Sequence, residues 1–265
     1  MNRIEKTFKS LVQQKKKALI PYITCGDPDL GMSYEIALEL IKSGADLLEL
    51  GVPFSDPTAD GPTIQRASER ALKQPFSMDD IMGLVQKIRK DSDIPLILFG
   101  YYNPFFSYGI SRFVNKAKKA GVDGVLIVDL PPEESDEIEP YLKTAGLDMI
   151  FLLTPTSDTQ RMDIISKKAT GFIYYVSVTG VTGARNTVDA NIRSSIVKIR
   201  EFTDIPIGVG FGISNKKQAQ EVSMWADAVI VGSALVKIIE EKRDGKALLK
   251  SVAHFVHELK EGMNG

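Results

Sequence analysis

The stretch ADLLELGVPFSDPTADGPT, Ala45 to Thr63, decides the fold. It begins with an apolar, strand-like run that ends at Leu50 and then becomes rich in Pro, Asp and Gly before a helical pattern starts. The strand presents one carboxylate, Glu49, and the loop after it presents another, Asp60. In α/β proteins, catalytic side chains are concentrated in the loops that follow strands. The stretch is therefore a strand–loop–helix unit that carries candidate acids and bases.

The same unit recurs along the whole chain. Short apolar runs alternate with helix-period segments, and most of the runs are continuously apolar, which is typical of parallel strands buried on both faces. The expected strands are Leu19–Thr24, Leu47–Gly51, Leu96–Gly100, Gly124–Val128, Met149–Leu153, Phe172–Ser177, Ile207–Gly210 and Ala228–Val231. The expected helices are Ser33–Lys42, Ile64–Leu72, Ile81–Lys90, Ile110–Ala120, Glu133–Thr144, Thr159–Lys168, Asn191–Glu201, Lys216–Val222, Leu235–Glu241 and Ala247–Glu261.

Eight such units in 265 residues predict an α/β fold, a (β/α)8 TIM barrel that forms a single domain over residues 1–265. An open sheet would usually need fewer strands or a second domain, and no linker-like stretch divides the chain. Ile4, Phe8, Leu11 and Val12 share one face, which predicts an extra N-terminal helix lying on the body of the fold. A further short helix is expected after the eighth strand.

Two sequence echoes also favour a barrel. Asp93–Leu96, before the third strand, resembles Asp204–Ile207 before the seventh. Gly121–Asp123, before the fourth strand, resembles Trp225–Asp227 before the eighth. Both echoes are four units apart, as two similar half-barrels would give, although convergence of similar αβ turns would give them too.

Composition excludes several classes of function. A net charge of −1 gives no electrostatic case for binding nucleic acid or an anionic membrane. Cys25 is the only cysteine, which leaves no disulfide framework or thiolate metal cluster and suits a reducing compartment. The N-terminal stretch lacks the long apolar run of a signal peptide or membrane span, so we expect a soluble, cytoplasmic protein.

Glycines gather on the last three strand-end loops. Gly183, Gly212 and the pair Gly232-Ser233 would let backbone N–H groups approach an anion, and the pair opens a helical stretch whose N-terminus favours negative charge. Phosphate sites in barrels recur after the seventh and eighth strands. The glycines could serve tight turns alone, but three adjacent loops favour a ligand that carries a phosphate.

The rim lacks most other catalytic groups. The only histidines, His254 and His257, lie in the last helix, where they form a surface pair rather than a metal site, so Ser-His-Asp and Cys-His chemistry is excluded at the rim. No lysine occurs in the sixth strand, which disfavours a Schiff-base aldolase, and no Rossmann or Walker fingerprint is complete. We therefore expect carboxylates to carry the chemistry, without a metal.

Three carboxylates remain open to more than one interpretation. Glu49 should point into the barrel mouth, away from Leu48 and Leu50, where desolvation would favour its neutral form; a buried ion pair is the alternative. Asp60 could instead shape the approach to the next helix. Asp56, which precedes a proline, is of a type that more often forms turns.

The loops closely resemble those of the tryptophan synthase alpha subunit family. The resemblance spans nearly the whole chain and is most specific in the opening stretch. The matching segments are Leu48–Pro57, Ala59–Pro62, Tyr101–Pro104, Asp129–Pro131, Gly180–Gly183 and Gly210–Ile213. It implies a (β/α)8 barrel that cleaves indole-3-glycerol phosphate to indole and D-glyceraldehyde 3-phosphate by a retro-aldol step in L-tryptophan biosynthesis.

The resemblance also implies residue roles. Glu49 would be the general acid and base, and Asp60 would stabilise the charge on the indole N–H. Gly180 and Thr182 would lie on a loop that closes over the substrate. The phosphate would be held by Gly183, Gly212, Gly232 and Ser233, and the indole pocket would be formed by Tyr22, Tyr102, Tyr175, Thr182 and Phe211.

The family works with a beta subunit that carries pyridoxal phosphate, so the resemblance implies an α2β2 complex and no cofactor in this chain. The aromatic segment Tyr101–Tyr108 supports an interface, although ordinary packing at the barrel mouth is the alternative. The interface residues would be Pro53, Asp56, Asn103, Pro104 and Phe105.

One position departs from the family. Thr58 stands where a larger apolar residue such as Leu or Met is usual, between the two expected catalytic carboxylates. This departure leaves two alternatives to the lyase: a non-catalytic or weakly catalytic subunit that activates its partner, or another phosphosugar barrel that acts as an isomerase or synthase.

Overall fold

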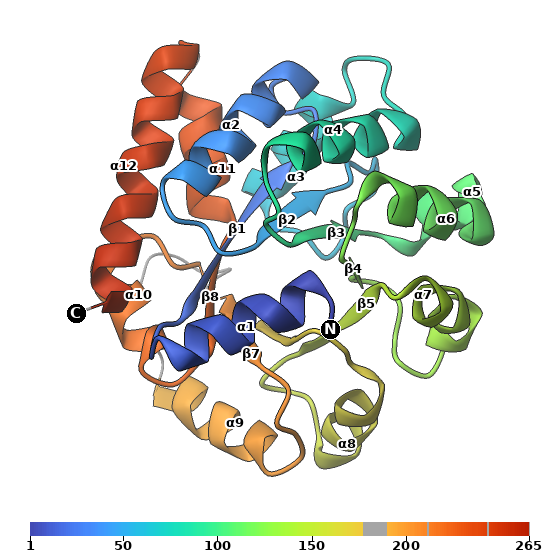
Figure 1. Ribbon diagram of the computed structural model, residues 1–265, viewed down its shortest axis with the longest axis vertical. Helices are drawn as coiled ribbons and strands as arrows, with labels where there is room; N and C mark the ends of the chain where they lie inside the picture. Colours follow the sequence, from blue (N-terminus) through green and yellow to red (C-terminus); the bar gives the residue numbers. More distant parts are fainter. Residues whose placement is uncertain (177–189, 211, 243, 265) are drawn as a thin grey trace.

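The computed structural model describes residues 1–176, 190–210, 212–242 and 244–264. Within them, eight parallel strands form a closed barrel in sequence order, and β8 pairs with β1 (Figure 1). The strands are β1 (Ala18–Thr24), β2 (Leu48–Gly51), β3 (Leu96–Gly100), β4 (Gly124–Ile127), β5 (Asp148–Leu153), β6 (Ile173–Val176), β7 (Ile207–Gly210) and β8 (Ala228–Val231). The predicted barrel is confirmed.

Helices surround the barrel. They are α1 (Arg3–Gln13), α2 (Leu30–Lys42), α3 (Pro62–Ala71), α4 (Met78–Asp91), α5 (Tyr102–Tyr108), α6 (Ile110–Ala120), the 3-10 helix η1 (Ser135–Glu137), α7 (Glu139–Ala145), α8 (Thr159–Lys168), α9 (Ala190–Arg200), α10 (Lys216–Ser223), α11 (Ser233–Glu241) and α12 (Gly245–Asn264).

Two helix predictions need correction. The single helix expected over Glu133–Thr144 is divided into η1 and α7, because Pro140 cannot donate a backbone hydrogen bond and its ring clashes with the preceding turn. The segment Tyr101–Tyr108, expected as a loop, contains α5, since Pro104 lies in the first turn, where proline is tolerated. Gly109, at φ +89°, lies between α5 and α6.

The N-terminal helix closes one end of the barrel. In Figure 1, α1 crosses that end, and Ile4 and Phe8 pack into the same buried cluster as Ile97, Leu126 and Phe172 from the barrel interior. The rings of Phe8 and Phe172 are 6.0 Å apart between centroids. The predicted N-terminal helix is thus confirmed, with one correction: Val12, expected on the buried face, is 69% exposed. The helix leaves the opposite end, where the strands terminate, as the open mouth.

A repeated hydrogen bond explains the sequence echo before strands four and eight. A side-chain oxygen just before each even-numbered strand accepts the backbone N–H of a residue at or near the start of the preceding strand. The pairs are Asp46 with Leu19 (2.7 Å), Asp123 with Leu96 (2.9 Å), Thr170 with Met149 (2.8 Å) and Asp227 with Ile207 (2.9 Å). This hydrogen bond occurs before every even-numbered strand. The sequence similarity before strands four and eight is therefore no specific evidence for two similar half-barrels.

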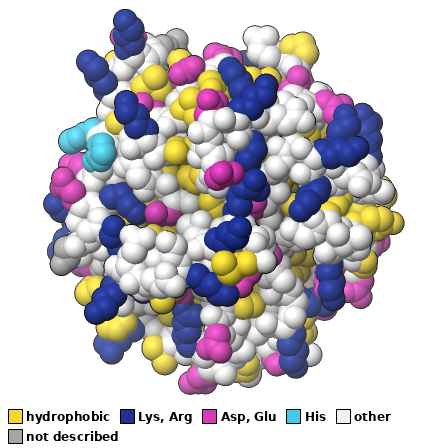
Figure 2. All heavy atoms as spheres, viewed as in Figure 1, with side chains coloured by type: hydrophobic (Ala, Val, Ile, Leu, Met, Phe, Trp, Pro, Cys, Tyr) yellow, Lys and Arg dark blue, Asp and Glu magenta, His cyan; other side chains and the backbone are white. Residues whose placement is uncertain are grey.

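The outer face carries mixed charge. Figure 2 shows Lys and Arg interspersed with Asp and Glu on the side that α1 crosses, with no large area of one sign. His254 and His257 are exposed on α12, as predicted. Among the described residues, no helix combines the length and the apolarity that a membrane span requires.

Candidate active site

Glu49 points into the barrel from β2. Its neighbours Leu48 and Leu50 face outward into the core beneath the helices, as strand alternation predicts. The Glu49 side chain is 1% exposed, and neither carboxylate oxygen has a hydrogen-bond partner among the described residues. Burial raises the pKa of Glu49 to about 8. The alternative prediction was that Glu49 forms a buried ion pair. Among the described residues, no cationic side chain pairs with Glu49.

Glu49 and Asp60 line the same cavity at the barrel mouth. Its volume is about 590 Å³, within the range of about 300–1,000 Å³ typical of small-molecule sites. The other lining residues come from most of the strand ends and from the start of α3: Tyr22, Ala59, Gly61, Pro62, Thr63, Ile64, Phe99, Val128, Leu152, Thr154, Tyr174, Val176, Gly210, Gly212, Ile230, Gly232 and Ser233. The two carboxyl groups can therefore act on one ligand.

Asp60 is held by Tyr101. The phenol of Tyr101 hydrogen-bonds the Asp60 carboxylate and accepts the backbone N–H of Ala59 at 2.9 Å. Burial raises the pKa of Asp60 to about 6, and the hydrogen bond from Tyr101 opposes the rise. Asp60 thus enters the pocket, which favours a chemical role over simple helix capping.

The two pKa values give the carboxyl groups different states at neutral pH. Glu49, at about 8, holds its proton, whereas Asp60, at about 6, is ionised. Two carboxyl groups whose environments separate their pKa values are the usual arrangement for an acid and its charge-stabilising partner. The cavity therefore offers a proton donor and an anion to the same ligand.

Replacing Tyr101 by Phe should raise the pKa of Asp60. The loss of one hydrogen bond to the ionised form, worth about 1 kcal/mol, corresponds to a rise of roughly 0.5–1 unit. Titration of the Asp60 carboxyl by NMR would measure it. Tyr108→Phe is the matched control, since that hydroxyl donates to Asp79 on the surface. An unchanged Asp60 pKa in Tyr101→Phe would show that the hydrogen bond does not tune this group.

Three of the expected phosphate-binding residues line the cavity together. Gly212, at φ +72°, adopts a left-handed conformation that favours glycine. Gly232 and Ser233 lie at the start of α11, whose first N–H groups have no partner within the helix and favour an anion. Four expected residues lie outside the described residues: Gly180, Thr182, Gly183 and Phe211.

Tyr22 lines the cavity beside Glu49, its register partner on the next strand. Its ring packs edge-on against Phe99, with 5.2 Å between centroids, and its hydroxyl lies 3.3 Å from Thr24 Oγ1. A Cβ at Gly51 would approach the phenol oxygen to 2.1 Å. Glycine at position 51 therefore makes room for Tyr22.

The expectation for Tyr175 is corrected to Tyr174. Tyr175 is 1% exposed and faces outward from β6, where its hydroxyl donates to Ser195 Oγ of α9 at 2.9 Å. Tyr174 faces inward and lines the cavity, with its phenol packed over Gly210. Strand alternation is the reason, because adjacent residues of a strand cannot face the same side.

Tyr102 is corrected in the same way. It is the first residue of α5, and its hydroxyl donates to Glu137 of η1 rather than entering the cavity. Every second residue of β3 faces the barrel interior, as Ile97 and Phe99 do, and Tyr101 follows this alternation. The Tyr101 side chain therefore reaches Asp60. This contact was missed, although the alternation of β3 could have indicated it.

The expected interface residues differ in exposure. Pro53 is buried, and Phe105 is fully buried against Phe113, with ring centroids 4.5 Å apart, so neither side chain forms an accessible surface in this chain. Phe106, which lies in the predicted segment Tyr101–Tyr108 but was not named as an interface residue, is 59% exposed on α5. Asp56 and Asn103 are exposed and Pro104 is half-buried. The exposed apolar side chain on α5 is therefore that of Phe106 and not that of Phe105.

Thr58 does not lie between the carboxylates inside the cavity. Its side chain is exposed, it is absent from the cavity wall, and its N–H donates to the Asp56 carbonyl at 2.9 Å. Thr58 is therefore not part of the cavity wall that Glu49 and Asp60 share.

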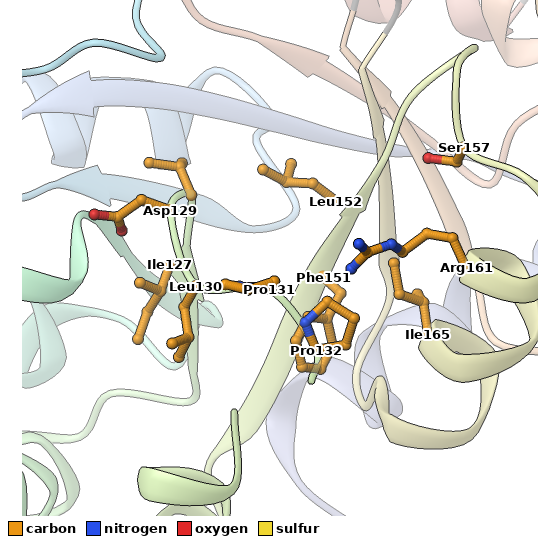
Figure 3. Close-up of a pocket in the computed structure, with 11 residues that line it drawn as sticks. Ile127, Asp129, Leu130, Pro131, Pro132, Phe151, Leu152, Ser157, Arg161 and Ile165 are labelled. Atoms are coloured by element: carbon orange, nitrogen blue, oxygen red, sulfur yellow. The ribbon is translucent and has the colours of Figure 1, made fainter. Parts of the chain in front are cut away.

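A second, smaller cavity of about 230 Å³ lies behind the wall formed by Val128 and Leu152. Figure 3 shows Arg161 of α8 directed into it and Asp129 turned away on the far side. Its one carboxylate, Asp129, accepts the N–H of Tyr102, so this cavity lacks a paired acid and base. Among the described residues, no three His, Cys, Asp or Glu side chains are grouped to hold a metal.

Comparison with known proteins agrees with this geometry. The model of the family "Tryptophan synthase alpha chain" matches residues 8–264. The tryptophan synthase alpha chain of Geotalea uraniireducens is 56% identical over 99% of this chain and 98% of its own length, and that of Synechocystis is 47% identical over the whole of both. The crystal structure of the Legionella pneumophila subunit alpha superposes with a TM-score of 0.93 at 40% identity, covering 100% of this chain and 99% of that one. The chain belongs to the tryptophan synthase alpha chain family.

Proposed function

We propose that Glu49 and Asp60 carry out the reaction of this family, the retro-aldol cleavage of indole-3-glycerol phosphate to indole and D-glyceraldehyde 3-phosphate. The chain is a carbon–carbon lyase of tryptophan biosynthesis. The observation that carries the residue assignment is that the two carboxyl groups line one cavity, Glu49 buried without a hydrogen-bond partner among the described residues and Asp60 hydrogen-bonded by Tyr101. We infer that the reaction takes place in the cytoplasm.

The reaction needs a proton at ring carbon C3 and the removal of another proton from the adjacent hydroxyl. Glu49 supplies the first, and the ionised Asp60 accepts a hydrogen bond from the indole N–H while positive charge develops on the ring. The Glu49 carboxylate then takes the hydroxyl proton. The carbon–carbon bond breaks, its electron pair returns to the ring, and the hydroxyl-bearing carbon becomes the aldehyde.

We infer the orientation of the substrate from two groups of residues that line the cavity. Gly212, Gly232 and Ser233, together with Gly183, bind the phosphate through backbone N–H groups and the dipole of α11. Tyr22 and Tyr174 form walls for the apolar ring. Holding the phosphate aligns the reacting carbon with the carboxyl groups, which lowers the entropic barrier.

The partner is a beta subunit that carries pyridoxal phosphate and receives the indole in an α2β2 complex. The exposed Phe106 on α5, with Asp56 and Asn103, supports a docking surface on the rim. No cofactor is assigned to this chain, since the carboxyl pair supplies the proton transfers. The activating-subunit alternative is not favoured, because the chain matches the tryptophan synthase alpha chain family over residues 8–264 and both carboxyl groups line the cavity.

Indole release by the purified chain, alone and with a tryptophan synthase beta subunit, tests the function. We expect slow cleavage of indole-3-glycerol phosphate by the chain alone and faster cleavage in the complex. An increase in the partner's reaction without any cleavage would favour an activating subunit. Turnover of a different phosphorylated sugar, with none of this substrate, would favour an isomerase or synthase.

A further inference from the structure

An ionic network joins the loop after β1 to the C-terminal halves of α3 and α11, outside the cavity wall, and takes no part in the steps above. Its centre is Arg70 of α3, which donates from Nε and Nη2 to the two carboxylate oxygens of Asp27, after β1, at 2.8 Å each. Its Nη1 donates to Glu240 of α11 at 2.9 Å. Glu240 also accepts two hydrogen bonds from Arg66, at 2.6 and 2.8 Å. The loop after β1, α3 and α11 are thereby tied together.

This network is more rigid than an isolated surface ion pair. Asp27 is buried, and three-quarters of the Arg70 side chain is covered. The hydrogen bonds from Arg66, together with the charge of Arg70, lower the pKa of Glu240 to about 2, so Glu240 is ionised throughout the working pH range. Bidentate guanidinium–carboxylate pairs fix orientation as well as distance, whereas single exposed pairs contribute little.

Both helices joined by the network carry parts of the cavity. α3 begins two residues after Asp60, and Gln65 in its first turns donates its side-chain amide to the Asp60 carbonyl at 2.9 Å. α11 begins at Ser233, which lines the cavity next to Gly232. The network therefore links the last turn of the helix that follows Asp60 to the last turn of the helix whose N-terminus lines the cavity. It acts on the cavity end of each helix through the length of that helix.

We propose that Arg70 is a positioning residue that fixes Asp60 relative to the phosphate-binding end of α11. A substrate held by its phosphate then presents its indole N–H to Asp60 at hydrogen-bond distance. The inference rests on the proposed roles of Asp60 and Ser233. Arg70 touches no substrate and acts through Asp60, and a displacement of about 1 Å at such a group can lower the rate about 100-fold.

Arg70→Lys is the first test. Lysine keeps a positive charge opposite the buried Asp27 but loses the planar fork, so the chain can fold while α3 is held less firmly. We expect kcat for indole release to fall about 10-fold with little change in KM. Arg112→Lys is the matched control, because Arg112 of α6 pairs with Asp79 of α4 on the exposed surface. Equal kcat values for Arg70→Lys and the control would overturn the proposal.

A double-mutant cycle with Asp60→Asn separates positioning from general stability. If Arg70 acts through Asp60, Arg70→Lys should have no further effect on the residual rate of Asp60→Asn. The same fractional loss in both backgrounds would show a merely structural role and overturn the proposal. Should Arg70→Lys fold poorly, Glu240→Gln, which leaves the Asp27–Arg70 pair intact, takes its place in the cycle with the same two outcomes. Full activity of Asp60→Asn alone would instead contradict the proposed role of Asp60.

Discussion

Glu49→Gln should lower the rate of indole release by about 10²–10⁴-fold, the contribution of a general acid–base group. Glutamine keeps the shape of the side chain but can neither donate the proton to ring C3 nor accept the hydroxyl proton. Steady-state assays with and without a beta subunit would measure the loss. A matched control is Glu137→Gln, at a surface carboxylate that accepts from Tyr102. Retained activity in Glu49→Gln would contradict the assignment.

The same variant should be more stable than the native chain at neutral and alkaline pH. The pKa of Glu49 rises from 4.5 to about 8 on folding, so the unfolded chain releases a proton that the folded chain keeps. Titration of Glu49 therefore leaves the free energy of unfolding of the native chain unaffected below about pH 4.5 and lowers it progressively as the pH rises to about 8. The full pKa shift of Glu49 corresponds to a loss on the order of 5 kcal/mol in the free energy of unfolding of the native chain above about pH 8.

Urea unfolding at several pH values would measure this effect. Glutamine does not titrate. The difference in free energy of unfolding between Glu49→Gln and the native chain should therefore increase in favour of the variant from pH 4.5 to pH 8 and stay constant above pH 8. A constant difference across this range would mean that Glu49 titrates normally in the folded protein.

Gly212→Asp should raise KM for indole-3-glycerol phosphate by about 100-fold or more. A carboxylate about 4 Å from the substrate phosphate costs roughly 4 kcal/mol at an effective dielectric constant of about 20. The left-handed backbone at φ +72° adds strain. Gly212→Ala carries the strain without the charge and separates the two causes.

Competition by inorganic phosphate would confirm the origin of the change. Gly212→Asp should weaken inhibition by phosphate as strongly as it raises KM, whereas Gly212→Ala should change both only slightly. An unchanged KM in Gly212→Asp would place the phosphate elsewhere.

The barrel and the orientation of Glu49 were predictable because they depend on local patterns. Apolar runs recur eight times along the chain, and alternation within β2 turns Glu49 inward when Leu48 and Leu50 face outward. The same alternation places Tyr101 and Tyr174 toward the cavity. The expectations for Tyr102 and Tyr175 followed motif resemblance, which identifies a segment but not the face on which each residue lies.

Other features of the site were not predictable because they join distant parts of the chain. Ala59 contacts Tyr101 across 42 positions, and Arg70 contacts Glu240 across 170. The raised pKa of Asp60 depends on how deeply the loop folds over the barrel mouth, which no local pattern specifies. Closed-barrel packing, rather than periodicity, produces these contacts.

The pKa of Glu49 in the substrate-free protein tests the central claim most directly. The carboxyl carbon resonances of chain labelled with 13C-glutamate can be followed over pH, and the Glu49 signal identified by its absence from Glu49→Gln. We expect a titration midpoint near pH 8, which leaves the group protonated at neutral pH. A midpoint near 4.5, the value of an ordinary glutamate, would contradict the assignment of Glu49 as the acid that protonates indole.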